Sequence, residues 1–183
     1  MPRPDGPGHD LRRLIDVLDR HGVEYLLVGG AAATAHGAER PTDDADCVVR
    51  RVRDNLDRLA AALRELNARL RVGGMIDAEA RLLPVQLDTL ALEAASMSTW
   101  MTDTGPFDVL AGLEAPDGRL VPYEELVERA VVFQGDGFLI RTAALDDIID
   151  AKERPAGQRT ARHYPSCVRY VRERREPPDT SGT

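Results

Sequence analysis

Three aspartates within four positions of the chain could bind a metal ion. Asp43, Asp44 and Asp46 lie directly before the apolar residues 47–49. If this stretch is a strand, its pleat places the side chains of Asp44 and Asp46 on one face and turns Asp43 away. Two carboxylates held this close repel each other, and a divalent cation with oxygen ligands relieves that repulsion. The spacing therefore predicts a metal site, although an isolated Asp-x-Asp pair also fits solvated loop acids.

A glycine pair upstream of these acids could bind phosphate. Gly29 and Gly30 follow the apolar run 23–28 and open the alanine-rich stretch 31–38. Backbone N–H groups at the start of a helix bind phosphate, whereas a glycine pair alone is often only a turn. Thirteen residues separate Gly30 from Asp44. The order of strand, glycines, helix and Asp-x-Asp predicts a phosphate site that faces the metal ligands.

The elements that must position these residues alternate between strand and helix at the start of the chain. Apolar periodicity and turn residues predict a helix over 8–21 with Asp10 as its cap, a strand over 23–28, a helix over 31–38, a strand over 45–52 and a helix over 53–70. Two strands within 98–113, joined by a turn at 103–106, are expected next. A helix over 122–130, a hairpin with its tip at 135–137 and broken helices from 144 to 175 complete the prediction. Segment 86–95 fits more than one type of structure. Asp108 falls in the second strand of the pair within 98–113.

Length and composition fit a single globular core of the α/β or α+β class. The chain has 183 residues, of which 43% are hydrophobic, 4% aromatic and 30% charged. We expect one domain over 1–143, a helical segment over 144–176 and a disordered tail over 177–183. No apolar run approaches the roughly 20 residues of a membrane span, and the first residues lack a signal peptide. We therefore expect a cytoplasmic protein without a membrane partner.

The charge of the chain is unevenly distributed. A net charge of −7 argues against a general nucleic-acid binder. Residues 152–175, however, hold eight Lys or Arg residues and two acids. This basic segment could contact a polyanion or an acidic partner, or it could be a solvated helix.

In combination, these motifs resemble the DNA polymerase β-like nucleotidyltransferase superfamily. Residues 28–46 are similar to its AbiEii/MenT-type toxin branch, because Arg40, Thr42, Asp44 and Asp46 match the branch motif Arg-x-Thr-x-Asp-x-Asp. The resemblance runs from about residue 8 to residue 157. It implies an α+β fold, in which helices flank a mixed sheet and a helical segment follows at the C-terminal end.

Two later segments extend the resemblance. Residues 102–110 are similar to the segment that carries the superfamily's third carboxylate, which places that carboxylate at Asp108. Residues 145–157 are similar to the segment with a phosphate-contacting lysine, which places the lysine at Lys152. By this resemblance Asp44, Asp46 and Asp108 are catalytic metal ligands, and Lys152 is a further catalytic residue.

The resemblance also implies a reaction. A nucleoside triphosphate would donate its nucleotide to an RNA acceptor, the 3′ end of tRNA, and a cognate antitoxin protein would restrain the enzyme. Two Mg²⁺ ions are expected at the carboxylates, with Mn²⁺ as a substitute. Gly29, Gly30, Arg40, Thr42 and Lys152 are expected to contact the nucleotide.

One departure leaves other functions open. Members of the branch continue into an Arg-x-Lys-Asp sequence, whereas Thr160 and Ala161 stand at the lysine and aspartate positions here, and Arg159 is shifted by one residue from the arginine position. One alternative is therefore a catalytically impaired protein that still binds nucleotide and metal. Another is a transferase that acts on a hydroxyl of a protein or of a small molecule.

Overall fold

The computed structural model describes residues 10–39, 42, 44–71, 87–134 and 137–152. Its elements in chain order are α1 (Leu11–Arg20), β1 (Tyr25–Val28), α2 (Gly29–Ala35), β2 (Ala45–Val49), α3 (Arg53–Glu65), β3 (Arg69–Leu70), α5 (Thr89–Ala94), β4 (Met97–Thr102), β5 (Gly105–Leu110), β6 (Gly112–Glu114), β7 (Leu120–Pro122), α6 (Tyr123–Leu126), a 3₁₀ helix η1 (Val127–Arg129), β8 (Val131–Gln134), β9 (Leu139–Thr142) and α7 (Leu145–Lys152).

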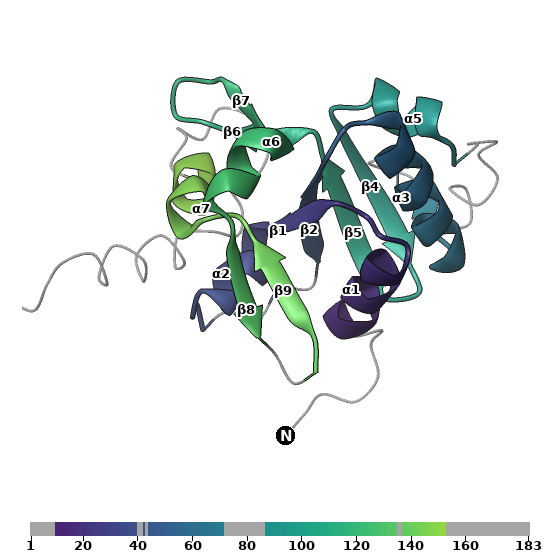
Figure 1. Ribbon diagram of the computed structural model, residues 1–183, viewed down its shortest axis with the longest axis horizontal. Coiled ribbons are helices and arrows are strands. Elements are labelled where there is room, and N and C mark those ends of the chain that lie inside the picture. The colour runs from purple at the N-terminus through teal and green to yellow at the C-terminus, as the bar shows by residue number, and fades with distance from the viewer. Residues whose placement is uncertain (1–9, 40–41, 43, 72–86, 135–136, 153–183) are drawn as a thin grey trace, which may run out of the picture.

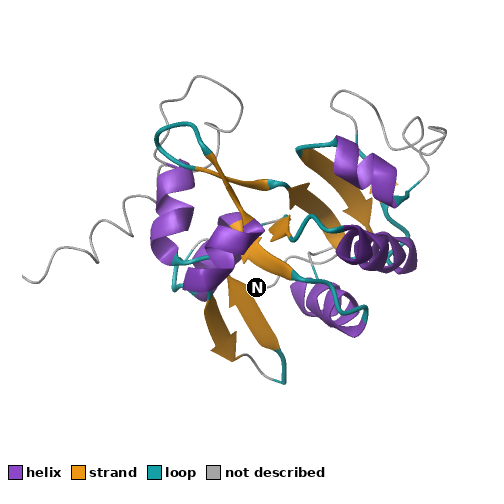
Figure 2. Cartoon of the chain, turned by 45° about the horizontal axis from the view of Figure 1, so that its top comes forward, coloured by secondary structure: helices purple, strands orange, loops and turns teal. Residues whose placement is uncertain are grey.

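A seven-stranded mixed sheet forms the centre of the molecule. Its strand order is β3-β4-β5-β2-β1-β9-β8, and β6 pairs with β7 in a separate two-stranded sheet. In Figure 1, α1, α3 and α5 gather on one side of the drawing and α2, α6 and α7 on the other. Figure 2 shows these helices flanking the strands in a second view. The expected α+β fold with a mixed sheet flanked by helices is confirmed.

Helix α1 follows its sequence pattern closely. The Asp10 side chain accepts a hydrogen bond of 3.0 Å from the N–H of Arg13, which confirms Asp10 as the N-cap. Leu14, Ile15 and Leu18 are fully buried. One apolar side and one cap were therefore sufficient to predict this helix.

Helix α3 ends earlier than its leucine spacing predicts. The expected helix ran over 53–70, but α3 ends at Glu65. Asn67 adopts a left-handed backbone conformation with φ of 50°, and the N–H of Ala68 donates to the carbonyl of Leu63 at 2.9 Å. Asparagine tolerates this conformation well, which ends the helix. Leu70 then pairs with Trp100 in the sheet instead of extending the helix.

Several short elements differ from the sequence prediction. The ambiguous segment 86–95 contains α5, and the expected helix 122–130 is divided into α6 and η1. The β6–β7 pair was not predicted. Gly112 lies in it so close to β7 that an added Cβ would come within 2.4 Å of the Val121 carbonyl oxygen. Residues 153–176 of the expected C-terminal helical segment lie outside the described residues.

One face of the sheet forms the main core. Tyr25, Leu27, Cys47, Trp100 and Phe107 point to this face and are buried. The Tyr25 hydroxyl donates to Asp19 of α1 at 3.2 Å, so α1 covers this face. The apolar side of α3 belongs to the same core. The opposite face carries Asp46 and Asp108.

In the described residues, no helix is long and apolar enough to cross a membrane.

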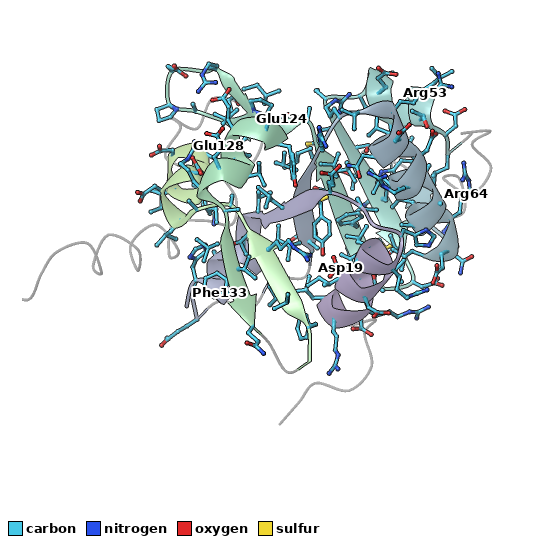
Figure 3. All side chains as sticks on the ribbon, viewed as in Figure 1. Asp19, Arg53, Arg64, Glu124, Glu128 and Phe133 are labelled. Carbon is cyan, nitrogen blue, oxygen red and sulfur yellow. The ribbon has the colours of Figure 1, made fainter. Side chains whose placement is uncertain are left out.

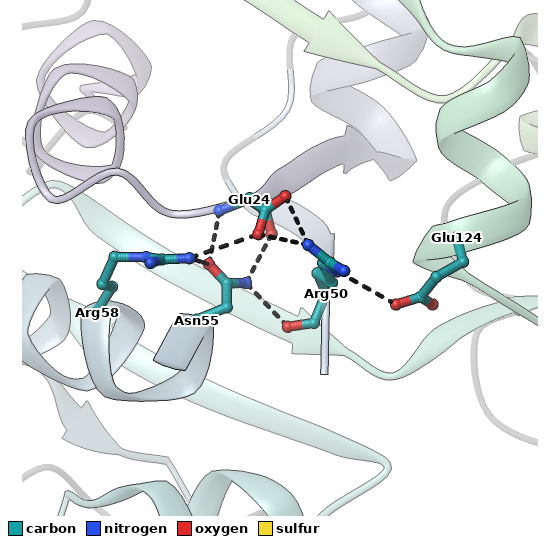
Figure 4. Close-up of polar contacts among 5 residues, drawn as sticks. All are labelled: Glu24, Arg50, Asn55, Arg58 and Glu124. Atoms are coloured by element: carbon teal, nitrogen blue, oxygen red, sulfur yellow. Dashed lines mark hydrogen bonds and ion pairs between the residues drawn. The ribbon is translucent and has the colours of Figure 1, made fainter. Parts of the chain in front are cut away.

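A buried asparagine joins α3 to the ends of β1 and β2. Asn55 is fully buried. Its Oδ1 accepts from the N–H of Glu24 at 2.7 Å, and its Nδ2 donates to the carbonyls of Glu24 at 2.9 Å and Arg50 at 2.8 Å. The side chains of Arg50 and Arg58 both reach the Glu24 carboxylate, and Arg50 also reaches Glu124 (Figure 4). The whole group lies at the end of β1 away from Asp46.

Replacing Asn55 by alanine should destabilise the fold strongly. The change would leave the part-buried Glu24 N–H and Arg50 carbonyl without their Asn55 partner, while the Glu24 carbonyl keeps its hydrogen bond from the N–H of Arg50. Each lost partner costs about 1–3 kcal/mol. We expect the free energy of unfolding in urea to fall by about 2–4 kcal/mol. The matched control is Glu124→Gln, which removes an exposed ion pair of 3.7 Å and should cost less than about 1 kcal/mol. Equal losses in the two variants would contradict this account.

Candidate functional site

Asp46 and Asp108 are direct neighbours in the sheet. Strands β2 and β5 are parallel, and Asp46 is paired with Asp108 in their register. Paired residues of adjacent strands point to the same face, and such strands lie roughly 4.8 Å apart. Asp44 directly precedes β2 and lies two residues before Asp46. The backbone therefore brings Asp46 together with an acid 62 positions later in the chain.

The Asp46 carboxyl is the most strongly perturbed acid of this group. Burial, followed by the charges of Asp44 and Asp108, raises its pKa to about 7. Lys152 and a hydrogen bond from the N–H of Gly30 act in the opposite direction. A carboxyl with this pKa is only partly ionised near neutral pH. The site therefore disfavours the ionised form of Asp46. A bound cation would favour the ionised form instead.

Asp108 is held by a side chain from β4. Burial raises the pKa of Asp108, and Asp44 also raises it, whereas a hydrogen bond from Thr99 and the charge of Arg71 lower it. Thr99 is paired with Asp108 in the β4–β5 register, so the two side chains lie on the same face. The direct effect of Asp44 on both other carboxyls indicates that the three negative charges act on one another.

The glycine pair lies where larger residues would collide with the site. Gly29 has φ of 63°, and a Cβ on it would come within 1.9 Å of the Asp46 Oδ2 atom. A Cβ on Gly30 would come within 2.7 Å of the Thr42 Oγ1 atom. Helix α2 begins at Gly29 itself, directly after β1, without an intervening turn. The glycines therefore allow the start of α2 to pack against Asp46 and Thr42.

Thr42 is bonded to the first acid of the pair. Its hydroxyl lies 2.6 Å from the Asp44 Oδ1 atom and donates to it. The N–H of Gly30 donates to Asp46. The predicted phosphate donor and the predicted metal ligand thus contact each other in this structure.

The remaining predicted site residues divide into two groups. Lys152 is the last residue of α7, and its charge acts on Asp46, so the fold brings it to the site. Arg40 and Asp43 lie outside the described residues. The same holds for Arg159 and the Thr160-Ala161 pair. The basic segment 152–175 is described only at Lys152.

The chemistry of these side chains fits a hard divalent cation. Carboxylate oxygens are the ligands that Mg²⁺ prefers, and burial together with the charges of Asp44 and Asp108 raises the pKa of Asp46. Across the described part of the chain, no three His, Cys, Asp or Glu side chains are already arranged around a common point at ligand distance. The backbone register thus places the acids on one face, and rotations of the side chains would have to complete the coordination.

Two residues at the site were not singled out by the sequence. Thr99 bonds to Asp108, and Arg71 acts on it electrostatically from the β3 side. Both lie on strands other than β5, so no local spacing links them to Asp108. Only the pairing of β3, β4 and β5 brings them there.

Comparison with known proteins supports the fold. One matching solved structure is the crystal structure of a proposed nucleotidyltransferase from Thermotoga maritima, with a TM-score of 0.50 and 14% sequence identity. The match covers 78% of this chain and 80% of that protein. No model of a protein family matches the chain, and no curated protein matches it. The fold is thus nucleotidyltransferase-like, and membership of the toxin branch stays a prediction.

Proposed function

We propose that this chain, which has a nucleotidyltransferase-like fold, is a Mg²⁺-dependent nucleotidyltransferase that transfers a nucleoside monophosphate to the 3′ end of tRNA. The observation that carries the proposal is the pairing of Asp46 with Asp108 on one face of the sheet, with Gly29 packed against the Asp46 carboxylate. A fold alone hosts many functions, so the proposal depends on these side chains and not on the sheet.

The reaction requires positioning more than covalent help. A terminal hydroxyl of the acceptor forms a bond to the α-phosphorus, the bond to the leaving pyrophosphate breaks, and the hydroxyl proton passes to solvent. When bound, Mg²⁺ neutralises phosphate charge and lowers the pKa of the attacking hydroxyl. Asp44, Asp46 and Asp108 would hold the cations.

The other side chains would orient the triphosphate. Lys152 acts on Asp46 from the end of α7, which is a suitable place for a cation that contacts phosphate. Thr42 holds Asp44 through its hydroxyl. Gly29 and Gly30 would offer backbone N–H groups to the phosphates once Asp46 turns to a cation. Arg40 is proposed to contact the nucleotide on the strength of the sequence motif.

The biological role is proposed from the sequence. Residues 28–46 resemble the AbiEii/MenT-type toxin branch, so we propose that the enzyme is the toxin of a bacterial toxin–antitoxin pair. An antitoxin protein would then be its partner, and the basic segment 152–175 would support contact with RNA. A small antitoxin gene beside the gene for this chain would support the role.

A transfer assay tests the activity. The full chain is incubated with total tRNA, Mg²⁺ and each of the four labelled triphosphates in turn. We expect incorporation of at least one nucleotide, its loss in EDTA, and a fall of at least about 10³-fold in Asp108→Asn, because one cation ligand is lost. No incorporation with any triphosphate, or full activity of Asp108→Asn, would contradict the proposal.

The two alternatives give different results in the same assay. A catalytically impaired protein would bind triphosphate in the presence of Mg²⁺ without turnover. The double change Thr160→Lys and Ala161→Asp would then create activity. A transferase for a protein or small-molecule hydroxyl would release pyrophosphate from labelled triphosphate only when such an acceptor is added. Activity of the unaltered chain on tRNA would exclude both alternatives.

A further inference from the structure

We propose that Arg71, together with Arg69, binds the phosphate backbone of the acceptor, so that a polynucleotide lies across β5, β4 and β3 when its end reaches the carboxylates. The inference rests on the proposed function, because it assigns the acceptor side of the same site. A polynucleotide is the proposed occupant of this surface, because its phosphates are complementary to the charges of the two arginines.

One row of residues crosses the sheet at the level of the carboxylates. Asp46 is paired with Asp108, and Asp108 with Thr99. The N–H of Arg71, directly after β3, donates to the carbonyl of Thr99 at 2.8 Å. Paired residues point to the same face, so Arg71 extends the row. The charge of Arg71 also acts on Asp108, which places the guanidinium on the face of the acids.

A second row runs beside the first. Arg69 is paired with Met101, and Met101 with Pro106. Because Ala45 is paired with Phe107, the next step of the same register places Asp44 beside Pro106. Asp46 and Asp44 thus each have an arginine in their own row, at the β3 edge of the sheet. The two arginines alternate with Leu70, which points toward the core side.

Among the described residues, side chains of β4 and Arg71 on this half of the sheet face are at least partly exposed. Helix α2 packs against β1, β2 and β9 on the face of the acids. On β4, Met97 is 53% exposed, and Thr99 and Met101 are only partly buried. Arg71 is exposed. A surface of threonine and methionine side chains, with the arginines at its rim, fits a sugar-phosphate strand better than it fits a globular protein.

The direction of the reaction assigns this surface to the acceptor. The triphosphate is expected at Gly29 and Gly30, next to β1. In phosphoryl transfer the attacking oxygen and the leaving group lie roughly in line on opposite sides of the phosphorus. With pyrophosphate leaving on the β1 side, the acceptor must approach from the β5 side. Arg71 lies two strands beyond Asp108, roughly 10 Å away, which is the reach of one or two nucleotides from the reacting end.

The charges of Arg69 and Arg71 are available for such a partner. In the part of the chain that the structure describes, neither forms an ion pair with an acid, whereas Arg50, Arg129 and Arg141 do. A guanidinium binds a phosphate through paired hydrogen bonds, and each contact adds one charge to the salt dependence of binding.

The first experiment measures kinetics with the full chain. In Arg71→Gln we expect kcat/KM for tRNA to fall at least about tenfold, which is the loss typical of one phosphate contact, while the KM for the triphosphate changes less than about twofold. The matched control is Arg53→Gln. Arg53 is also exposed, but it begins α3, which packs on the other face of the sheet (Figure 3). Arg71→Lys keeps the charge and should recover part of the loss.

The second experiment measures binding without transfer. Anisotropy of labelled tRNA is followed at several salt concentrations, without triphosphate. We expect Arg71→Gln to weaken binding and to lower the salt slope by about one, and Arg69→Gln to do the same. Arg53→Gln should do neither. Unchanged far-ultraviolet circular dichroism shows that each variant is folded.

The outcomes separate this inference from the proposed function. If tRNA binds through Arg71 but no nucleotide is incorporated, the inference stands and the proposed activity fails. If nucleotide is incorporated but Arg71→Gln raises the KM for the triphosphate instead, the activity stands and the inference is wrong. Equal effects of Arg53→Gln and Arg71→Gln, or absence of tRNA binding by the unaltered chain, would also overturn it.

Discussion

Asp46→Asn is expected to abolish nucleotide transfer and at the same time to stabilise the protein in EDTA at pH 8. Activity should fall at least about 10³-fold, because a neutral amide is a poor ligand for Mg²⁺ and the charge of the triphosphate is not offset without the cation. Stability should rise because Asp46 is ionised at pH 8 in a place that disfavours its charge. The same substitution thus separates the functional value of this carboxylate from its structural cost.

The sign of the stability effect follows from linkage. Burial and the charges of Asp44 and Asp108 raise the pKa of Asp46 to about 7, above its ordinary value of 3.8. Between these values the folded state binds more protons than the unfolded state. The stabilising contribution is therefore complete below pH 4 and is lost as the pH rises through 7. We expect a gain on the order of 2 kcal/mol for Asp46→Asn at pH 8 and almost none at pH 4.

Urea unfolding in EDTA at both pH values measures this difference. Asp54→Asn is the control, because Asp54 is an exposed acid in the first turn of α3 and does not lie on the strands that carry the site. It should change neither activity nor the pH dependence. Added Mg²⁺ should stabilise the unaltered chain more than Asp46→Asn. A loss of stability in Asp46→Asn at pH 8 would show that the carboxylate supports the fold, contrary to our account.

Gly29→Ala should cause the second large loss of activity. Gly29 has φ of 63°, where a Cβ is strained by roughly 1 kcal/mol, and its Cβ would come within 1.9 Å of the Asp46 Oδ2 atom. Either the carboxylate or the start of α2 must move by more than an ångström. A displacement of this size in a catalytic group costs about 10²-fold in rate.

Gly22→Ala is a matched control for the backbone strain. Gly22 has φ of 66°, close to that of Gly29, but its Cβ would meet only the Cδ atom of Arg58 at an ordinary distance of 3.7 Å. Both variants should therefore lose roughly 1 kcal/mol of stability from strain, and only Gly29→Ala should lose transfer activity. If both variants transfer nucleotide equally well, the close approach of Gly29 to Asp46 has no functional importance.

The sequence by itself determined the local parts of this protein. The period of the apolar residues and the Asp10 cap predicted α1, and turn residues at 103–106 predicted the β4–β5 hairpin with Asp108 in its second strand. The order of Gly29-Gly30 and Asp44-x-Asp46 predicted that the glycines lie beside the acids, because these features depend on neighbours within about 20 residues. The binding of phosphate and metal by these residues stays a prediction. Such short-range patterns are governed by backbone geometry that any chain shares.

Only the tertiary structure decided which distant residues meet. The parallel pairing of β2 with β5 makes Asp108 the neighbour of Asp46, and the pairing of β3 with β4 brings Arg71 into the same row. The sequence placed Leu70 on a helix, yet Asn67 ends α3 and Leu70 joins the sheet. The physical reason is that strand register depends on burial and backbone hydrogen bonds between segments far apart in the chain, and no local spacing of residues records which segments will pair.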